Sequence, residues 1–401
     1  MQIPPRAAAL LLAWPFASAC TEASGDAAQP VVRDSAGITI VENPAPGAAD
    51  APLWRVPEEP SVAIGTAEGP PETQLFRVTS VRRAPDGTVI VSNTGTNEVR
   101  LYGPDGAHLA SLGREGDGPG EFRMVYGAWP WAGDSVLAFD MAQRRLQVFD
   151  RAGVAGRSLS LSSGGPAEAL AGVLADGTLV TYSTHRSAPG MERHVQSHLY
   201  LHRSASGELL DSIGSLEWLT ITPRQVGEGV FMMGAPIFSP AGQSAVGADH
   251  IYLSSAREPA VEVRDPTGRL VRIVRWPDQD RRVTQADREA YRRGRLAMEE
   301  TEDERRGIES MIDGSEWSET LPTLAGLRSD PGGGFWVRLY QRVGQDDPPL
   351  WWTFGGDGVF QGTVHLPEDF ELHEIGSDYL LGLARDELGV AQVRVYPRES
   401  R

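Results

Sequence analysis

The chain has 401 residues, of which 45 are Gly and 29 are Pro, while only 7% are aromatic; because Gly and Pro end strands and break helices, this composition favours a turn-rich β protein. All 37 basic residues are Arg, which excludes Schiff-base chemistry and P-loop phosphate binding, since both need a lysine. The formal net charge of −17 repels phosphate backbones and anionic headgroups, so we expect no nucleic-acid partner.

Residues 1–19 have the pattern of a secretory signal peptide. A single positive charge at Arg6 precedes the apolar run 7–17, which is too short to span a bilayer, and small residues follow it. The segment ASAC (17–20) resembles the lipobox of bacterial lipoproteins, except that Ala17 stands where Leu is usual. That resemblance implies that the thiol of Cys20 is lipidated and that this residue begins the mature chain; simple secretion is the alternative.

Cys20 is the only cysteine of the chain, so we expect no internal disulfide. The stretch from Cys20 to residue 37 is small, polar and acidic, and we predict a flexible tether there. We therefore expect an exported protein of the cell envelope, in the periplasm or on the outer surface, that contacts the membrane only through its lipid anchor.

One unit recurs six times along the rest of the chain. In each copy a turn signal such as Asp-Gly leads directly into a short run that is apolar on both faces, as expected of a strand covered on both sides. These runs are 88–91, 135–139, 178–182, 250–255, 335–340 and 379–384. Each is followed by a run with cleaner polar and apolar alternation: 98–103, 145–150, 197–203, 261–265, 350–355 and 391–396. A further strand follows in five copies, at 108–113, 157–161, 208–214, 269–276 and 360–367.

The unit is therefore a four-stranded antiparallel meander, and six such units with little helix between them predict an all-β fold, a six-bladed β-propeller. The sixth copy ends after Tyr396 without a fourth strand, whereas SVAIG (61–65) looks like an isolated fourth strand near the N-terminus. We predict that this strand closes the last blade, which removes exposed sheet edges that favour aggregation. The propeller domain then spans residues 38–397.

The stretch GREGDGPGEFRMVYGAW (113–129) resembles the NHL-type repeat, in which a Gly-rich loop ending in Phe leads into strand, turn and strand. From about Ile38 to Tyr396 the chain is similar to the six-bladed β-propeller lipoproteins of environmental bacteria. The resemblance covers nearly the whole mature chain, and it implies a fold and not an activity.

The loop GREGDGPGEF (113–122) is predicted to connect the first and second blades. Gly116, Gly118 and Gly120 allow the positive φ angles that such a crossing needs, and Phe122 can pack between blades. The three acidic residues of the loop would repel a phosphate, so the alternative to a plain connector is a cation site.

Two longer segments interrupt the repeat on the face of the inter-blade loops. A helical insertion at about 278–314, between blades four and five, has the pattern of a capping box at Thr284 and Asp287. This insertion is either a lid over the central channel or a surface addition. In the second insertion, 217–238, Met232 and Met233 favour core packing over a promiscuous binding surface.

His194, His198 and His202 recur every four residues in a segment with strand character. Four residues along a strand span about 13 Å, so a polar strand face is favoured over a zinc site. Neither a nucleophile elbow nor an HExxH motif is present. The metal ligands of propeller lactonases and lyases come from different blades and form no local motif. The absence of these motifs therefore does not exclude an enzyme.

The repeat, the signal peptide and the missing catalytic motifs favour a binding or scaffold module. We expect a monomer that takes a protein, small-molecule or glycan ligand on the face of the inter-blade loops. Its contact residues are predicted at the starts of inner strands and in the loops between second and third strands: Asn93, Asn97, Arg123, Tyr126, Asp140 and Arg144. One alternative is a lactonase-like hydrolase or lyase with a divalent metal in the central channel; no other cofactor is predicted. The other is a carbohydrate-binding propeller that uses Trp129 and Trp131.

Overall fold

A computed structural model describes residues 29–45, 54–161, 167–187, 192–227, 229–345, 348–386 and 389–398. The predicted signal peptide, Cys20 and most of the predicted tether lie outside these described residues. Strands dominate the described part, and neither of its α-helices has the length and apolar character needed to cross a bilayer.

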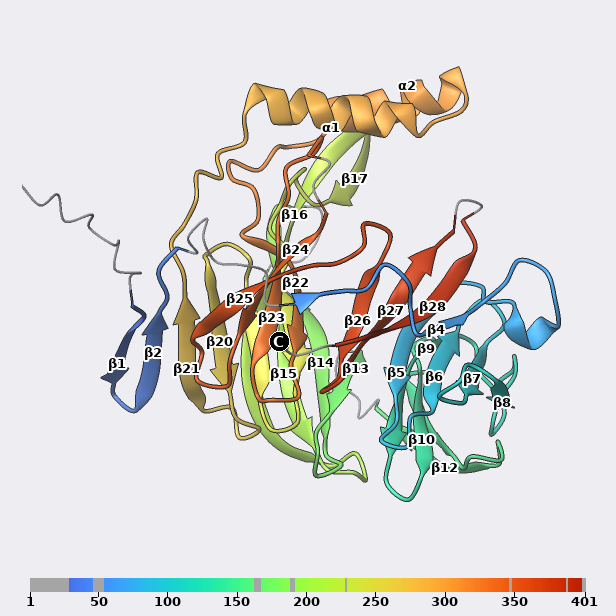
Figure 1. The fold of residues 1–401 in the computed structure, drawn as a ribbon. Helices are drawn as coiled ribbons and strands as arrows, with labels where there is room; N and C mark the ends of the chain where they lie inside the picture. Colours follow the sequence, from blue (N-terminus) through green and yellow to red (C-terminus); the bar gives the residue numbers. More distant parts are fainter. Residues whose placement is uncertain are drawn as a thin grey trace, which may run out of the picture.

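The described strands form six sheets, numbered I to VI in chain order (Figure 1). Sheet I consists of β5 (Val78–Arg83), β6 (Val89–Asn93), β7 (Glu98–Tyr102) and β8 (His108–Leu112). Sheet II consists of β9 (Val125–Trp131), β10 (Ser135–Asp140), β11 (Arg145–Phe149) and β12 (Ala155–Ser160). Sheet III consists of β13 (Glu168–Val173), β14 (Leu179–Arg186), β15 (His194–Arg203), β16 (Leu209–Gly227) and β17 (Val230–Gly234).

The last three sheets each include a strand from the N-terminal segment. Sheet IV consists of β18 (Gln243–Val246), β19 (Ile251–Ser254), β20 (Ala260–Arg264) and β21 (Leu270–Arg275), followed by β2 (Ile38–Glu42) and β1 (Val31–Ser35). Sheet V consists of β22 (Leu324–Ser329), β23 (Phe335–Leu339), β24 (Leu350–Phe354), β25 (Phe360–His365) and β3 (Trp54–Arg55). Sheet VI consists of β26 (Glu371–Ile375), β27 (Tyr379–Arg385), β28 (Ala391–Pro397) and β4 (Val62–Ile64). Within each sheet, strands that are consecutive in the chain pair antiparallel, which confirms the predicted antiparallel meander.

The second strand of each sheet begins where the sequence predicts it, directly after a turn. In sheet I the turn residue Gly87 has φ +91°, and the side chain of Asp86 accepts the N–H of Thr88 at 3.0 Å. All five residues of β6 that follow are buried. A strand that is apolar on both faces must pack against other elements on both faces, and here the neighbouring sheets pack against it.

The N-terminal segment runs along the outer edges of three consecutive sheets. β2 pairs parallel with β21, β3 pairs parallel with β25, and β4 pairs antiparallel with β28. The strand predicted at 61–65 therefore lies beside the last strand of the sixth sheet. The predicted tether is wrong at its end, because Val31–Ser35 forms β1, a hairpin partner of β2. Its turn residues Ala36 and Gly37 both have positive φ, which suits a two-residue hairpin turn.

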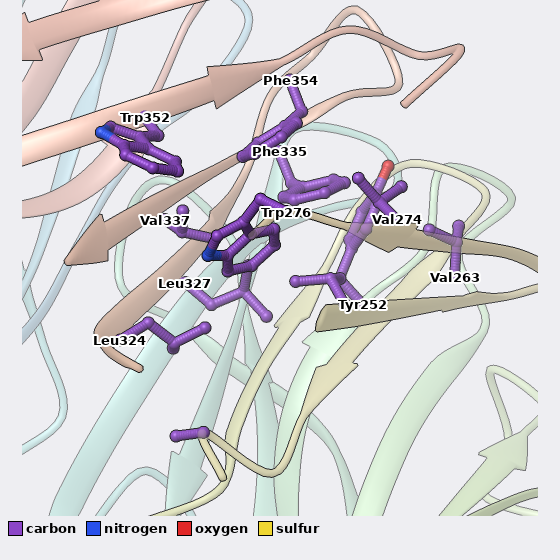
Figure 2. Packing of buried hydrophobic residues seen from close by; sticks show 12 residues of the cluster. Tyr252, Val263, Val274, Trp276, Leu324, Leu327, Phe335, Val337, Trp352 and Phe354 are labelled. Carbon is purple, nitrogen blue, oxygen red and sulfur yellow. The ribbon is translucent and has the colours of Figure 1, made fainter. Parts of the chain in front are cut away.

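Buried side chains of the described residues form clusters that join each sheet to the next. Five clusters join sheets I and II, II and III, III and IV, IV and V, and V and VI. A sixth cluster joins sheet VI back to sheet I. Figure 2 shows the cluster between sheets IV and V, in which Tyr252 and Trp276 face Phe335 and Phe354. The rings of Phe335 and Phe354 stack at 4.9 Å between centroids. Each sheet thus packs face to face against two others, which is a propeller-like arrangement.

The predicted helical passage consists of two α-helices between β21 and β22, α1 (Gln285–Ala297) and α2 (Glu302–Asp313). The predicted capping box is present, because Thr284 and Asp287 exchange side-chain to backbone hydrogen bonds. A second capping box of Thr301 and Glu304 starts α2, which divides the passage into two. Figure 1 shows both helices at the top of the molecule, beyond the ends of the sheets. A short 3₁₀ helix, η1 (Pro71–Thr73), lies between β4 and β5.

Candidate functional site

The two segments that interrupt the repeat meet at one end of the sheets. The first is the arm, residues 215–227 and 229–234, formed by the end of β16 and by β17 (Figure 1). The second is the helical insertion, taken from here on with the chain on either side of it, as residues 276–323. Directly after the arm, Ile237 donates its N–H to the carbonyl oxygen of Glu316 at 2.8 Å and accepts the N–H of Ser318 at 2.9 Å. The end of α2 also contacts β16. The two interruptions, although separated in the sequence, therefore form one structure.

Three aromatic side chains from these segments pack together. Phe238 lies 5.4 Å from Tyr291 and 5.6 Å from Trp317, and Tyr291 lies 5.7 Å from Trp317, between ring centroids. The guanidinium of Arg288 lies 5.3 Å from the centroid of Trp317. The edge-to-face contact between Tyr291 and Phe238 holds α1 against the chain that follows the arm.

A cavity of about 350 Å³ lies beneath this junction. It is lined by Arg224, Ala235, Pro236, Ile237, Phe238, Ser239, Tyr291, Met311, Ser315, Pro322, Tyr340 and Val343, and we call it the insertion pocket. A second cavity of about 140 Å³ adjoins it and shares Pro322 and Tyr340. The volume and the mainly apolar lining are those of a small-molecule site, in which few polar groups orient the ligand.

Arg224 is the charged residue in this lining. It forms no ion pair with any described residue, and its Nε is buried without a hydrogen-bond partner. The guanidinium lies over Gly234 on the neighbouring strand, where an added Cβ would lie 3.0 Å from Cζ. Arg224 is half-buried, and its guanidinium, which has no ion-pair partner among the described residues, can pair with an anionic group of a ligand.

A nearly buried carboxylate fixes the helical insertion to sheet V. Asp287, 5% exposed, accepts a hydrogen bond from the guanidinium of Arg342 at 2.6 Å. Arg342 also donates to the carbonyl oxygen of Asp280 at 2.9 Å. Burial alone would raise the pKa of Asp287, but the hydrogen bonds from Thr284 and the charge of Arg342 outweigh it and lower the pKa.

Replacing Asp287 by Asn should therefore destabilise the protein at neutral pH by about 2 kcal/mol, because Arg342 loses its charged partner. The pKa of Asp287 is lower in the folded state than in the unfolded state, where it is 3.8, so its carboxylate stabilises the folded state at pH values above 3.8. This stabilisation is lost once the pH falls below the pKa of the folded state. The difference from the unsubstituted protein should thus disappear as the pH falls through this range. Urea unfolding at several pH values measures this difference in stability. The control is Asp303→Asn, an exposed change on α2, which should show no such pH dependence.

The contact between the helical insertion and the arm depends on Gly314, which ends α2. A Cβ at this position would lie 1.9 Å from the carbonyl oxygen of Gln225. Gly314→Ala should therefore push the arm away and cost about 1–3 kcal/mol. Gly307→Ala is the matched control, because nothing lies within 4 Å of its added Cβ and a helical Gly→Ala change stabilises by about 0.5–1 kcal/mol. Thermal unfolding that ranked the two variants equally would contradict the close contact.

Two of the predicted ligand contacts have structural roles. Asn93 and Asp140, both fully buried, end the second strands of sheets I and II. The side chain of Asn93 accepts the N–H of Phe76 at 2.7 Å, and that of Asp140 accepts the N–H of Arg123 at 2.7 Å. Both side chains satisfy backbone donors of the chain that enters their own sheet. Both side chains are fully buried, so neither is accessible to a ligand in this structure.

The other predicted contacts lie on sheets I and II and line neither cavity. Asn97 and Arg144 occupy equivalent turns after β6 and β10, with φ +53° and +51°. Arg123 pairs with Asp117 in the preceding loop, which lowers the pKa of that carboxyl to about 2. Tyr126 is exposed. The structure thus leaves Arg123, Tyr126 and Arg144 at the surface without joining them into a pocket.

The loop 113–122 is a connector between β8 and β9, as favoured by the sequence. Phe122 is fully buried and packs 5.6 Å from Phe149. Gly116 and Gly120 have positive φ, whereas Gly118 does not. Glu121 pairs with Arg114 at 2.8 Å and accepts the N–H of Gly118 at 2.8 Å. Because Arg114 and Arg123 engage two of the three acids, the loop offers no cluster of free carboxylates.

The two tryptophans proposed for glycan binding are core residues. Trp129 is 9% exposed and belongs to the cluster between sheets II and III, against which Trp131 also packs. Trp129 therefore lacks the exposed ring face that sugar stacking needs, and Trp131 is partly buried. Met232, for which the sequence favours core packing, is instead 50% exposed on β17 and does not pack into a core.

The histidines of β15 do not gather around a metal. His194 and His198 are buried, so the predicted polar strand face is wrong for both. His198 stacks on Trp218 at 4.6 Å between centroids, and burial lowers its pKa to about 4. His202 hydrogen-bonds the hydroxyl of Thr178 at 2.8 Å. Across the described ranges, no three His, Cys, Asp or Glu side chains are grouped so that they could hold a metal ion.

Sequence reasoning placed both interruptions on one face but did not find the residues that line the insertion pocket. Arg224, Phe238 and Tyr340 come from different parts of the chain and belong to no motif. One signal could have found these residues. The two interruptions come directly before and directly after sheet IV in the sequence, which brings their ends close in space.

No family model and no curated protein matches the sequence. Among solved structures, the chain is similar to a presumed exported protein of Bacteroides fragilis NCTC 9343, at 10% identity and a TM-score of 0.51, over 90% of this chain and 100% of that one. A DUF4221 family member from Bacteroides vulgatus ATCC 8482 matches at 11% identity and a TM-score of 0.49, over 85% and 97%. Regucalcin, a calcium-binding protein from Agrobacterium tumefaciens C58, matches at 11% identity and a TM-score of 0.40, over 90% and 97%. The first likeness concerns the fold alone.

Proposed function

We propose that the chain is a closed six-bladed β-propeller that works as a ligand-binding module. The six sheets and the six clusters between successive sheets support the closed ring. The pairing of β4 with β28 supports closure by the N-terminal segment, because it joins residues from both ends of the propeller in one sheet. The resemblance to NHL-type propeller lipoproteins agrees with this architecture.

The ligand we propose is a small molecule with an apolar body and an anionic group, bound in the insertion pocket. The observation that carries this proposal is the unpaired guanidinium of Arg224 in a lining rich in aromatic and aliphatic side chains. The aromatic rings of Phe238, Tyr291 and Tyr340 offer contact area for the apolar body. The helical insertion and the arm would then both be parts of the binding site.

The proposed place of action is the cell envelope. The signal-peptide pattern of residues 1–19 and the lipobox-like segment ending at Cys20 support export and a lipid anchor. The presumed exported protein of similar fold is consistent with export. We propose a monomer that reaches its ligand on the face of the inter-blade loops.

The test compares octanoate with octanol, which has the same chain and no charge, in thermal unfolding of the mature protein. Octanoate should raise Tm more than octanol, because its carboxylate can pair with Arg224. Arg224→Met should remove the preference for octanoate, while Arg305→Met, an exposed change on α2, should keep it. The absence of any shift with both compounds, or an unchanged preference in Arg224→Met, would contradict the proposal.

The lactonase-like alternative requires a divalent metal in the channel. The metal content of purified residues 21–401, measured by mass spectrometry after gel filtration without chelator, tests it. A stoichiometric divalent ion would support the enzyme and would direct a search for lactone or ester hydrolysis.

A further inference from the structure

The first strands of sheets V, VI and I lie side by side. β26 contacts β22 on one side and β5 on the other, as Figure 1 shows. Each of these strands carries a nitrogen-rich side chain: Arg328 on β22, His373 on β26 and Arg82 on β5. None of these three residues lines either cavity of the candidate site.

Both guanidinium groups extend onto the backbone of β26. Arg328 donates from Nε to the carbonyl oxygen of Leu372 at 2.9 Å, and Arg82 donates from Nη1 to that of His373 at 3.5 Å. Each also donates to the carbonyl oxygen of the residue before it, at 2.9 Å and 3.0 Å respectively. The two groups therefore approach consecutive residues of one strand from its two sides.

Two acidic residues lie nearby, one beside Arg82 and one beside His373. Glu374 lies 3.9 Å from Nε of Arg82 and is shared, because it also accepts the N–H of Arg83 at 3.2 Å and the hydroxyl of Tyr379. Burial raises the pKa of Glu374 in spite of these partners. The other acid, Glu371, lies 3.7 Å from Nε2 of His373 and is 67% exposed.

Arg328 forms no ion pair with any described residue. Two of its five N–H donors are directed to carbonyl oxygens, which leaves the others free. Burial, followed by the charge of Arg82, lowers the pKa of Arg328 to about 10. Arg328 is half-buried, so a bound anion would supply the ion-pair partner that it lacks among the described residues.

His373 is poised beside this unpaired charge. Burial, Arg328 and Arg82 lower its pKa to about 3, so the imidazole is neutral at neutral pH. Its side chain is 10% exposed, and its Nε2 has no hydrogen-bond partner among the described atoms. A neutral imidazole can donate one N–H, and a bound acceptor would satisfy it.

We propose that Arg82, Arg328 and His373 form a binding site for a compact oxyanion, which is either free phosphate or the phosphate or carboxylate group of a larger molecule. Guanidinium forks match the geometry of such groups, and the free donors of Arg328 supply charge-assisted hydrogen bonds. Water reaches the cluster, since Arg82 is 27% and Glu374 21% exposed. The site is independent of the function proposed for the insertion pocket.

The test adds inorganic phosphate, phenyl phosphate or acetate to the mature protein, each against sodium chloride at equal ionic strength. Thermal unfolding and the NMR titration of His373, assigned with His373→Gln, are followed. A bound anion should raise Tm and raise the pKa of His373, because it stabilises the imidazolium form. A stronger effect of phenyl phosphate than of inorganic phosphate assigns the site to the phosphate group of a larger molecule, the reverse assigns it to the free ion, and a response to acetate assigns it to a carboxylate.

Arg328→Met should weaken anion binding about tenfold or more, because it removes a charged hydrogen-bond donor. Arg385→Met, an exposed change in the same sheet as His373, should leave binding unchanged. The octanoate response should persist in Arg328→Met, so failure of this site and failure of the insertion pocket are distinguishable. No shift of Tm or of the His373 pKa with any of the three anions, or equal binding by Arg328→Met, overturns the proposal. If Arg328→Met does not fold, the His373 titration in the unsubstituted protein decides.

Discussion

Ile64→Asp is expected to destabilise the protein by about 4–5 kcal/mol, because it removes a buried side chain and places a carboxylate in the cluster between sheets VI and I. Ile64 is 3% exposed and lies on β4, the N-terminal strand that pairs with β28. If this strand closes the propeller, its loss also exposes the edge of β28 to other molecules. We therefore expect a lower midpoint in urea and soluble aggregates in gel filtration.

Ala63→Asp is the matched control, because Ala63 lies on the same strand with its side chain exposed. It pairs in register with Arg394, so the new carboxylate faces water and a basic neighbour. This variant should unfold like the unsubstituted protein. Equal unfolding midpoints for Ile64→Asp and Ala63→Asp would mean that β4 is not an integral strand of sheet VI.

Glu168→Gln should lower the free energy of unfolding by about 3 kcal/mol, since it leaves the buried guanidinium of Arg203 without a counter-charge. Arg203 donates from Nε to Glu168 at 2.8 Å, and the side chains of both residues are 7% exposed. The carboxylate of Glu168 also accepts the hydroxyl of Thr181 at 2.7 Å. The pair thus ties the first, second and third strands of sheet III together.

The double variant Glu168→Met with Arg203→Met tests whether the loss comes from the unpaired charge. Removing both charges should restore much of the stability, because two apolar side chains of similar size can replace a buried ion pair. Glu208→Gln, an exposed change in the turn before β16, should alter the unfolding free energy by less than about 0.5 kcal/mol. A loss in Glu168→Gln no larger than that of Glu208→Gln would contradict the burial of this pair.

The repeated strands were predictable because their signals are local. The turn around Gly87 and the apolar run after it lie within ten residues, and β6 begins there as expected. The same holds for the capping box of Thr284 and Asp287, whose partners are three residues apart. The strand at 61–65 was predictable for a different reason, because the repeat pattern itself lacked one strand at its end.

The roles of polar side chains were less predictable. Asn93 and Asp140 stand at the ends of inner strands, where either a ligand or a backbone N–H can be the partner, and the sequence does not distinguish the two. In the structure the partners are the N–H groups of Phe76 and Arg123, which would otherwise lack these hydrogen bonds. Trp129 was misjudged similarly, since alternation along its strand does not say which face a neighbouring sheet covers.

The sequence by itself determined the repeating meander, the order of the strands, the glycine turns and the helical interruption, because each depends on contacts between residues close in the chain. Only the tertiary structure decided that the arm and the helical insertion meet around Arg224, and that Arg82 and Arg328 converge beside His373. These groups are distant in the sequence, and their chemistry arises from partial burial and, for Arg224 and Arg328, from the lack of an ion-pair partner among the described residues. Both are properties of the packed sheets, which no local pattern of residues encodes.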